Sequence, residues 1–298
     1  MTEWTGPIEF ALTMLRSATP LVFAAMGVLL AERSGVLHIG VEGAMLLGAF
    51  AAILAAVMLD PWTGVAVGAM VGLLAGVVLA VITVRLPSDQ VVMGIAFNIA
   101  AVGVTSFAFR MTASLTQRMV PPLVSPGLAD IPVVGALLAI PPLAWPAFGL
   151  AGAIWYVLHR TGPGLLLRSV GESSHAAAAA GINVLAVRFA TLVLAGMLSG
   201  LGGAALTVGW VRSYSDNITL GRGFIALAAV YFGRWNPAWT VVGCLLFGAG
   251  EALAFGAQGA GANPHYYLMI PYLLTLLVVA ITGRARAPQE VGRPYVRA

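Results

Sequence analysis

Nine apolar stretches divide the chain, and they constrain its fold more than any other feature. They lie at about 10–31, 41–59, 63–84, 91–109, 143–158, 186–208, 223–233, 237–257 and 266–282. A helix needs about 20 apolar residues to cross the hydrocarbon core of a bilayer. The stretch 223–233 is too short to cross alone, because about 11 helical residues rise only about 16 Å. The pattern predicts an all-α polytopic membrane protein with eight or nine transmembrane segments, some of them broken or short.

Composition excludes a soluble globular domain. Of the 298 residues, 60% are hydrophobic and 9% are charged, and the mean hydropathy is +0.95. A soluble domain carries about 25% charged residues. The single cysteine, Cys244, lies in an apolar stretch, so neither a disulfide nor a metal site is expected. The arginines are scattered and form no basic patch, so we also expect no nucleic-acid partner, and we expect no cofactor.

All fifteen basic residues are arginines, and their placement predicts the orientation, because cytoplasmic loops carry an excess of positive charge. With the C-terminus in the cytoplasm, ten arginines fall inside and five outside. Nine segments then place the N-terminus outside. The inner set is Arg33, Arg85, Arg160, Arg168, Arg188, Arg234, Arg284, Arg286, Arg293 and Arg297, and the outer set is Arg16, Arg110, Arg118, Arg212 and Arg222.

The chain is predicted to form one transmembrane domain, residues 1–298, with three segments outside the apolar stretches. Residues 110–142 are rich in proline, so we expect a structured external loop there. Residues 159–188 form a long cytoplasmic loop, and residues 284–298 form a cytoplasmic tail. No GxxxxGK[ST] motif for nucleotide binding occurs, so any ATP-driven process needs another chain.

Between the first two apolar stretches, the segment from Ala31 to Gly43 contains two acids, an arginine, a histidine and three glycines. Non-helical backbone at membrane depth is tolerated only where it is buried in protein or lines a cavity. One interpretation is therefore a broken element beside a pathway through the membrane. The other is an ordinary cytoplasmic turn between two spans, for which Arg33 is expected.

The cytoplasmic loop 159–188 contains the run Ala176–Ala180, which is a strong helix former. Ser173 or Ser174 is suited to cap this helix at its N-terminal end, and Gly181 is suited to end it. The pattern predicts a short helix outside the bilayer that docks on a partner. The alternative is a solvated connector.

Four further side chains exceed what a plain membrane helix requires. Asn98 lies in apolar sequence and needs a hydrogen-bond partner, either on a neighbouring helix or on a solute. Phe97 is able to stack on a ring or to face lipid. Glu251 and Gln258 are seven residues apart on one helix face, which indicates either a pathway lining or an outer end that reaches water.

Four motifs in order carry a family resemblance: Ser34–Gly43, Asp89–Val92, Gly171–Asn183 and Phe232–Pro237. Together they resemble the permease subunits of ATP-binding-cassette (ABC) importers for nucleosides and simple sugars, which are related to the ribose and branched-chain amino-acid permeases. The resemblance covers about Ser17 to Gly283, and the first motif is most similar to the nucleoside branch. His38 stands where these permeases usually have an asparagine.

The resemblance implies two kinds of site residue. The segment 171–183 resembles the coupling helix that docks into a groove of the ATPase subunit, and Ser34–Gly43 resembles a break in a central helix beside the translocation path. The expected coupling residues are Gly171, Glu172, Ser173, Ala177, Ala180, Gly181, Ile182 and Asn183. The expected pathway residues are Ser34, Gly35, His38, Gly40, Glu42, Phe97, Asn98 and Glu251.

The resemblance also implies a mechanism and partners. A substrate-binding lipoprotein delivers the solute to the outer face, a separate ATPase subunit drives alternating access, and a second permease, commonly a different chain, pairs with this one. The chain itself performs no covalent chemistry and lies in the lipid of the bacterial inner membrane. A nucleoside is favoured as the solute, with a ribose-like sugar as the alternative.

Two other function classes compete with this interpretation. An ion-coupled secondary transporter would use intramembrane acids, and Glu42 and Glu251 are candidates, but no internal repeat is apparent. An intramembrane hydrolase would use Ser34 and His38 as nucleophile and base, but the sequence offers no orienting third group or oxyanion arrangement.

Overall fold

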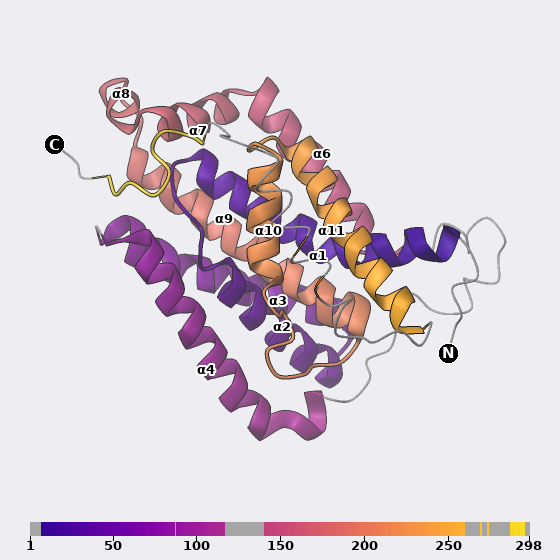
Figure 1. The fold of residues 1–298 in the computed structure, drawn as a ribbon. Helices are drawn as coiled ribbons and strands as arrows, with labels where there is room; N and C mark the ends of the chain where they lie inside the picture. The colour runs from indigo at the N-terminus through magenta and orange to yellow at the C-terminus, as the bar shows by residue number, and fades with distance from the viewer. Residues whose placement is uncertain are drawn as a thin grey trace.

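The computed structural model describes residues 7–86, 88–116, 140–259, 269, 273 and 287–295. In this part of the chain every regular element is helical (Figure 1). The elements are α1 (Pro7–Arg33), α2 (Val41–Met58), α3 (Pro61–Ala80), η1 (Val81–Arg85), α4 (Gln90–Thr116), α6 (Ala144–Arg160), α7 (Gly162–Glu172), α8 (Ser174–Ala179), α9 (Val184–Ala204), η3 (Ala205–Val211), α10 (Arg222–Phe232) and α11 (Pro237–Gly259). The elements η1 and η3 are π-helical continuations of α3 and α9.

Helices occupy eight of the nine predicted apolar stretches, and the ninth, 266–282, falls almost entirely outside the described residues. Among the described residues, six helical segments are long and apolar enough to cross a membrane, formed by α1, α2, α3 with η1, α4, α9 with η3, and α11. Helix α6 has 17 residues and α10 has 11. The prediction that 223–233 is a short element is therefore confirmed.

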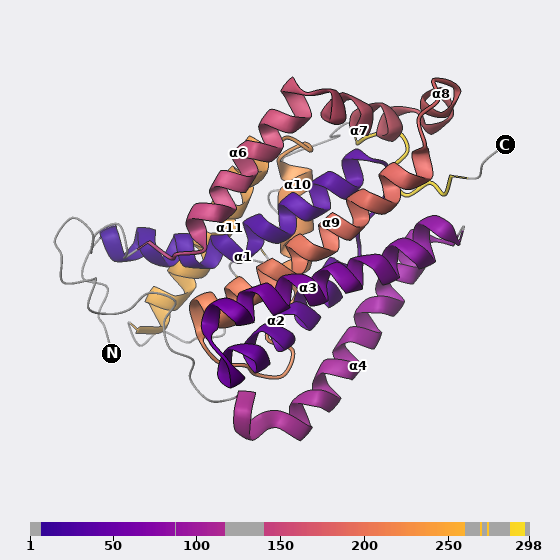
Figure 2. The ribbon, with the colours of Figure 1, turned by 180° about the vertical axis from the view of Figure 1, so that it is seen from behind.

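Helix α9 lies at the centre of the bundle, where it packs against α1, α2 and α3. Helix α1 also contacts α6, α10 and α11, whereas α4 lies at the periphery against α2 (Figures 1 and 2). Large apolar side chains such as Ile99 and Phe107 on α4 are exposed. That is the expected surface for a segment that meets lipid rather than water.

Glycines set the close approach of the central helices. A Cβ built on Gly72 of α3 would lie 2.5 Å from the carbonyl oxygen of Gly196 and 2.6 Å from the Cα of Gly200, both on α9. A Cβ on Gly48 of α2 would lie 2.7 Å from the carbonyl oxygen of Gly200. Small residues at such faces let helix backbones meet, which is how membrane helices gain packing energy without a hydrophobic driving force.

The short connection between α2 and α3 shows how local chemistry starts a span. Pro61 occupies the first turn of α3, and the Asp60 carboxylate accepts hydrogen bonds from the backbone N–H groups of Trp62 and Thr63. The hydrogen bond from the Thr63 hydroxyl holds the pKa of Asp60 below its ordinary value. Proline at this position and an acid as N-cap are favourable helix starts.

The predicted loops are described in part. Helix α4 continues to Thr116, so the first residues of the expected external loop 110–142 are helical, and residues 117–139 lie outside the described residues. At the opposite end of α4, the helices α7 and α8 and the segment 287–295 lie together at one end of the bundle (Figures 1 and 2). The sequence predicted one short helix in 159–188, and the structure has two.

Candidate functional site

The connection between α1 and α2 is buried non-helical backbone. The turn begins where the N–H groups of Ser34 and Val36 both donate to the carbonyl of Ala31, and Gly35 has a φ of +88°, a value that favours glycine. The side chains of Ser34 and Val36 are fully buried, and His38 is 1% exposed. This connection is therefore not a solvent-exposed turn, and of the two interpretations the structure agrees with a break inside the protein.

The first acid of this segment holds one end of α10. The Glu32 carboxylate accepts a hydrogen bond of 2.5 Å from the indole nitrogen of Trp235 and one of 3.4 Å from the hydroxyl of Tyr231. Next to it, the Arg33 guanidinium donates to the backbone carbonyl of Trp235 at 2.7 and 2.9 Å. Glu32 and Arg33 together fasten the C-terminal end of α10 to the end of α1.

The second acid holds the other end of α10. One oxygen of Glu42 accepts hydrogen bonds from the Thr219 hydroxyl at 2.6 Å and the Gly221 N–H at 2.9 Å, and the other accepts one from the Gly223 N–H at 2.7 Å. A carboxylate at this position satisfies backbone donors that the first turn of a helix leaves unpaired, and it lies at the positive end of the helix dipole.

The break therefore runs alongside α10 for the whole length of that helix. Eleven helical residues rise about 16 Å, which is about half the hydrocarbon core. Since Arg33 lies at one end of α10 and Glu42 at the other, the non-helical segment 34–40, which has turns at each end, covers this depth, and α2 begins well inside the bundle. Both buried acids, Glu32 and Glu42, thus find their hydrogen-bond donors on α10 and on the residues that flank it.

The polar side chains of the break bond to α9. The Ser34 hydroxyl donates to the Ala31 carbonyl and lies 2.8 Å from the hydroxyl of Thr191. The Nε2 of His38 lies 3.2 Å from the hydroxyl of Ser199, whose own proton is donated to the Ala195 carbonyl. With the Ser199 proton on that carbonyl, we assign the tautomer of His38 that donates from Nε2 to Ser199. The ring then carries its free lone pair on Nδ1, which is buried and has no partner among the described residues.

Helix α4 covers the other side of the break. The Oδ1 of Asn98 accepts from the Gly43 N–H at 2.8 Å, and its Nδ2 donates to the Ile39 carbonyl at 3.0 Å. Gln90 accepts from the N–H of Leu37 at 2.7 Å. The ring of Phe97 is the neighbour of Gly43, with its Cδ1 3.0 Å from where a Cβ on that glycine would lie. Of the two partners expected for Asn98, a neighbouring element or a solute, the structure shows the first: Asn98 bonds to the break and to the start of α2.

Replacing Asn98 with leucine removes both hydrogen bonds to the break while keeping a similar volume. We expect the midpoint of thermal unfolding in detergent to fall, because the buried Gly43 N–H and Ile39 carbonyl lose their partners, at a cost of about 1–3 kcal/mol. The matched control is Ile99→Leu on the exposed face of α4, which should leave the midpoint unchanged. An unchanged midpoint for Asn98→Leu would mean that this contact does not hold the break.

Glu251 is paired rather than open to water. Its carboxylate lies 3.2 Å from the Nε of Arg222, the residue that begins α10, and Glu251 is 8% exposed. The Arg222 guanidinium also lies over the ring of Trp210, 5.8 Å from its centroid. Intramembrane ionisable residues generally need such partners. The ion pair joins α10 to α11.

The short helix predicted in the loop 159–188 is present as α8. Its N-cap is Ser173, whose hydroxyl accepts from the Ala176 N–H, and Ile182 N–H donates to the Ala177 carbonyl after Gly181 turns the chain with a φ of +85°. Both sequence predictions, the serine cap and the glycine stop, are confirmed. Asn183 then caps α9 by accepting from the Ala186 N–H.

Exposure divides the predicted coupling residues into two sets. Glu172, Ala180, Gly181 and Asn183 are exposed, whereas Gly171 and Ala177 are buried, and Ser173 and Ile182 are intermediate. Ala177 packs with Val170 of α7 and Val184 of α9 in a small apolar cluster that fixes α8 to the bundle. Among the residues of α8 that the sequence did not single out, His175, Ala176 and Ala179 are exposed too.

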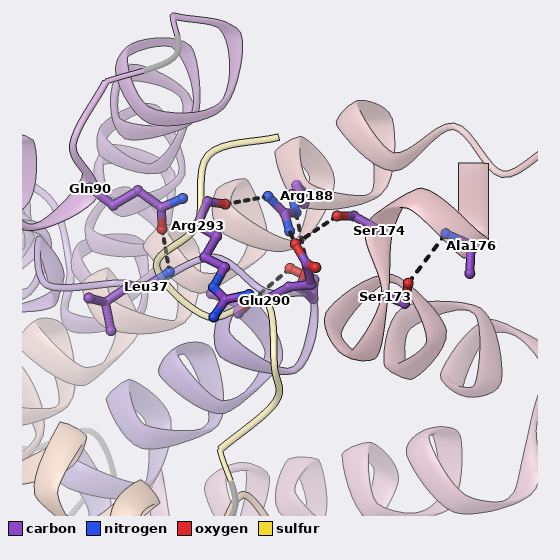
Figure 3. A network of polar contacts seen from close by, with 10 residues as sticks. Leu37, Gln90, Ser173, Ser174, Ala176, Arg188, Glu290 and Arg293 are labelled. Carbon is purple, nitrogen blue, oxygen red and sulfur yellow. Dashed lines mark hydrogen bonds and ion pairs between the residues drawn. The ribbon is translucent and has the colours of Figure 1, made fainter. Parts of the chain in front are cut away.

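Sequence reasoning missed three features at this end of the molecule. Helix α7 precedes α8, and the side chain of Arg188 is buried. The segment 287–295 contacts α7, α8 and Arg188 through Glu290 (Figure 3). A recess of about 250 Å³ beside Tyr295 is lined by the end of α8 and the start of α9. The Thr161-Gly162-Pro163 start of α7 was the available signal, since Thr161 is its N-cap and proline occupies its first turn.

The comparisons with known proteins agree with this architecture. Residues 10–279 match the family model described as branched-chain amino acid transport system / permease component. The chain is 36% identical to the nucleoside ABC transporter permease protein NupC of Lactococcus lactis, over 95% of each chain. It is 34% identical to the guanosine ABC transporter permease protein NupQ of Bacillus subtilis, over 94% of each.

A more distant relative is a putative glucose ABC transporter permease protein of Haloferax volcanii, which is 31% identical over 89% of each chain. The matches extend over nearly the whole length of the chain and of these relatives, so they concern the complete bundle rather than one motif. The chain is therefore a multi-pass membrane protein that belongs to the family of branched-chain amino acid transport system permease components.

Proposed function

We propose that the chain is the transmembrane permease subunit of an ABC importer, and that it forms the translocation path for a nucleoside by alternating access. The observation that carries this proposal is α8: a capped helix with an exposed outer face, fixed to the bundle through Val170, Ala177 and Val184. In this proposal the ATPase docks on the exposed face of α8, and the apolar contacts of α8 pass its displacement to the bundle. The nucleoside and guanosine permeases among the relatives support the choice of solute.

We further propose nine segments, with the N-terminus outside and the C-terminus in the cytoplasm of a bacterium. Three arginines of the expected inner set lie close to one another, because Arg188 donates to the carbonyl of Ser34, which follows Arg33, and to the carbonyl of Arg293. Arg222 of the outer set lies at the far end of α10 from Arg33. This grouping supports the orientation that the excess of arginine predicts.

Within the pathway, we assign the solute contact to the break and the supporting roles to its neighbours. The Nδ1 of His38 is a buried acceptor that a hydroxyl or N–H donor of a nucleoside would satisfy. Ser34, Gly35 and Gly40 form the break itself, and Phe97 lies against its end. Glu42, Asn98 and Glu251 border the path and hold its helices in place through the bonds described above.

The proposed partners are an ABC ATPase subunit at α8, a second permease chain and an extracytoplasmic substrate-binding lipoprotein. The test is uptake of labelled guanosine into proteoliposomes that contain the complete complex, with ribose and glucose as competitors. ATP-dependent nucleoside uptake that excess sugar does not reduce is the expected result. Uptake of sugar alone would instead favour the sugar branch, to which the putative glucose permease points. Uptake driven by an ion gradient without the ATPase would contradict the proposal.

The hydrolase alternative is not supported by the geometry. Ser34 bonds to Ala31 and Thr191, whereas His38 bonds to Ser199, so the two side chains are engaged with different partners. A nucleophile and its base should lie within hydrogen-bond reach of one another.

Substitutions in the coupling segment should uncouple ATP hydrolysis from transport. Glu172→Arg reverses the charge of an exposed residue beside α8, and Gly181→Leu places a side chain at a φ of +85°. We expect nucleoside uptake to fall about tenfold or more in both variants while membrane insertion is retained. Glu172→Arg changes the charge of the proposed docking surface, and Gly181→Leu distorts the end of α8, since left-handed backbone strains a leucine by about 1–2 kcal/mol. Uptake and ATP hydrolysis are measured on the same proteoliposomes.

The matched control for the glycine is Gly181→Asn, because asparagine tolerates left-handed backbone. It should retain most of the coupling. Unchanged transport in both Glu172→Arg and Gly181→Leu would place the docking surface elsewhere.

A further inference from the structure

The segment 287–295, here called the strap, lies against α7, α8 and α9 at once (Figure 3). The N–H of Glu290 donates to the carbonyl of Gly171 at 3.0 Å. The carboxylate of Glu290 accepts a hydrogen bond of 2.7 Å from the hydroxyl of Ser174, the first residue of α8. Pro288 is buried, and the ring of Tyr295 lies 5.6 Å from that of His175 on α8. The strap is therefore hydrogen-bonded directly to α8, the proposed docking helix.

Arg188 joins the strap to the break. Arg188 is 1% exposed near the start of α9, and its guanidinium forms an ion pair of 3.5 Å with Glu290. It also donates to the carbonyl of Arg293 at 2.8 Å and to the carbonyl of Ser34 at 3.2 Å. One buried side chain thus connects α9, the strap and the first residue of the break.

The break packs directly against this ion pair. A Cβ on Gly35 would lie 2.8 Å from the Nη2 of Arg188 and 3.0 Å from the Cβ of Glu290. On the other side, a Cβ on Gly171 would collide with the carbonyl oxygen of Arg33. The strap, the end of α7 and the break are therefore in van der Waals contact, so none of them moves far without displacing the others.

A buried guanidinium is stable only while its partners remain in place. Charges taken out of water need both an opposite charge and hydrogen bonds, and removing one partner leaves the other uncompensated. Glu290 is the only carboxylate recorded in contact with Arg188 among the described residues, and it also receives Ser174. The same carboxylate therefore bonds at once to α8 and to the arginine that contacts the break.

We propose that the strap is a transmission element, in which Glu290 and Arg188 act as positioning residues that relay displacement of α8 to the break between α1 and α2. This inference rests on the proposed function, because it takes α8 as the element that the ATPase moves. The route runs from Ser174 through Glu290 and Arg188 to Ser34. Every step in it is a contact of 3.5 Å or less.

The first test compares two substitutions in the strap within the complete, reconstituted importer. Glu290→Ala removes the ion pair and the acceptor for Ser174, whereas Arg293→Ala removes an exposed charge but keeps the carbonyl to which Arg188 donates. We expect Glu290→Ala to reduce nucleoside uptake about tenfold or more while ATP hydrolysis continues, because it removes two contacts of the carboxylate and the loss of a single hydrogen bond to a charged group already corresponds to about tenfold. Arg293→Ala should behave as the unmodified complex.

Two outcomes of this comparison would overturn the proposal. One is undiminished uptake by Glu290→Ala. The other is a proportional fall of uptake, ATP hydrolysis and thermal stability, which would indicate a purely structural role for Glu290.

The second test restores the connection by a covalent link. Ser174→Cys and Glu290→Cys together remove the hydrogen bond and place two thiols side by side, so that a mild oxidant joins α8 to the strap by a disulfide; the native Cys244 is fully buried on α11. We expect the double variant to be uncoupled and oxidation to restore its uptake. Oxidation should not change the uptake of either single variant. A complete cross-link without recovery would contradict the relay.

This second test also separates the strap from the proposed function. The yield of the cross-link, measured by mass spectrometry, reports whether the strap lies on α8 and needs no solute. A high yield in a complex whose unmodified form imports no nucleoside would count against the proposed function, whereas a low yield in a complex that imports nucleoside would count against the strap.

Discussion

Gly200→Val should prevent the bundle from forming a stable protein. A Cβ on Gly200 would lie 2.7 Å from the Cα of Gly72 and closer still to the carbonyl oxygen of Gly68, and both of these are backbone atoms of α3. Because no side chain is available to move aside, α3 and α9 must separate. Overpacking of a core costs about 1–3 kcal/mol when side chains adjust, so we expect about 3 kcal/mol or more here. The measurement is the yield of monodisperse protein and its unfolding midpoint in detergent.

The matched control is Gly152→Val in the middle of α6. Gly152 is exposed, and a Cβ there would meet nothing within 4 Å. Both substitutions change glycine to the same β-branched residue inside a helix, so their effects on helix propensity are the same. A Gly200→Val protein that unfolds at the same temperature as Gly152→Val would mean that α3 and α9 do not pack as described.

Glu42→Ala is the second substitution with a large expected effect. It removes three hydrogen bonds from the carboxylate, leaving the Thr219 hydroxyl and the N–H groups of Gly221 and Gly223 without an acceptor. Hydrogen bonds to charged groups each contribute about 1.5–3 kcal/mol. Thr219 and Gly223 are buried, so water does not readily replace the lost acceptor. We expect the unfolding midpoint to fall and nucleoside uptake to be lost.

Glu42→Gln separates an anchoring role from a solute contact. Glutamine keeps one acceptor oxygen, so it should restore part of the thermal stability that alanine loses. If Glu42 anchors α10, stability and uptake should fall together from glutamate to glutamine to alanine. A variant with normal stability but weakened solute binding would instead show that the carboxylate contacts the solute.

The local elements of the proposed sites could be predicted because their determinants are adjacent in the sequence. Ser173, the alanine run and Gly181 specify α8 through a cap, a helix former and a left-handed stop. Likewise, the glycines and charges after Ala31 indicated that α1 ends near Arg33 and that α2 begins near Val41. Apolar length located the spans for the same reason.

The partners of the buried charges could not be predicted, because each lies far away in the sequence. Glu42 bonds to residues 177 to 181 positions later, and Arg188 bonds to Ser34 on one side and to Arg293 on the other. From the sequence alone, Arg188 is expected in a cytoplasmic loop and Glu290 in a solvated tail, and nothing indicates that the two side chains pair. A single sequence requires that intramembrane charges have partners, but it does not say which element supplies them.

The fastening of α10 at both ends has a consequence for how this molecule changes shape. Glu32 and Arg33 hold one end of α10, and Glu42 holds the other. Tilting α10 away from α1 and α2 would break buried polar bonds at both ends together, so we expect these three helices to move as one body. In the proposed alternating access, opening and closing would then occur by sliding of this body against its neighbours, with the hinges in the segments that flank it.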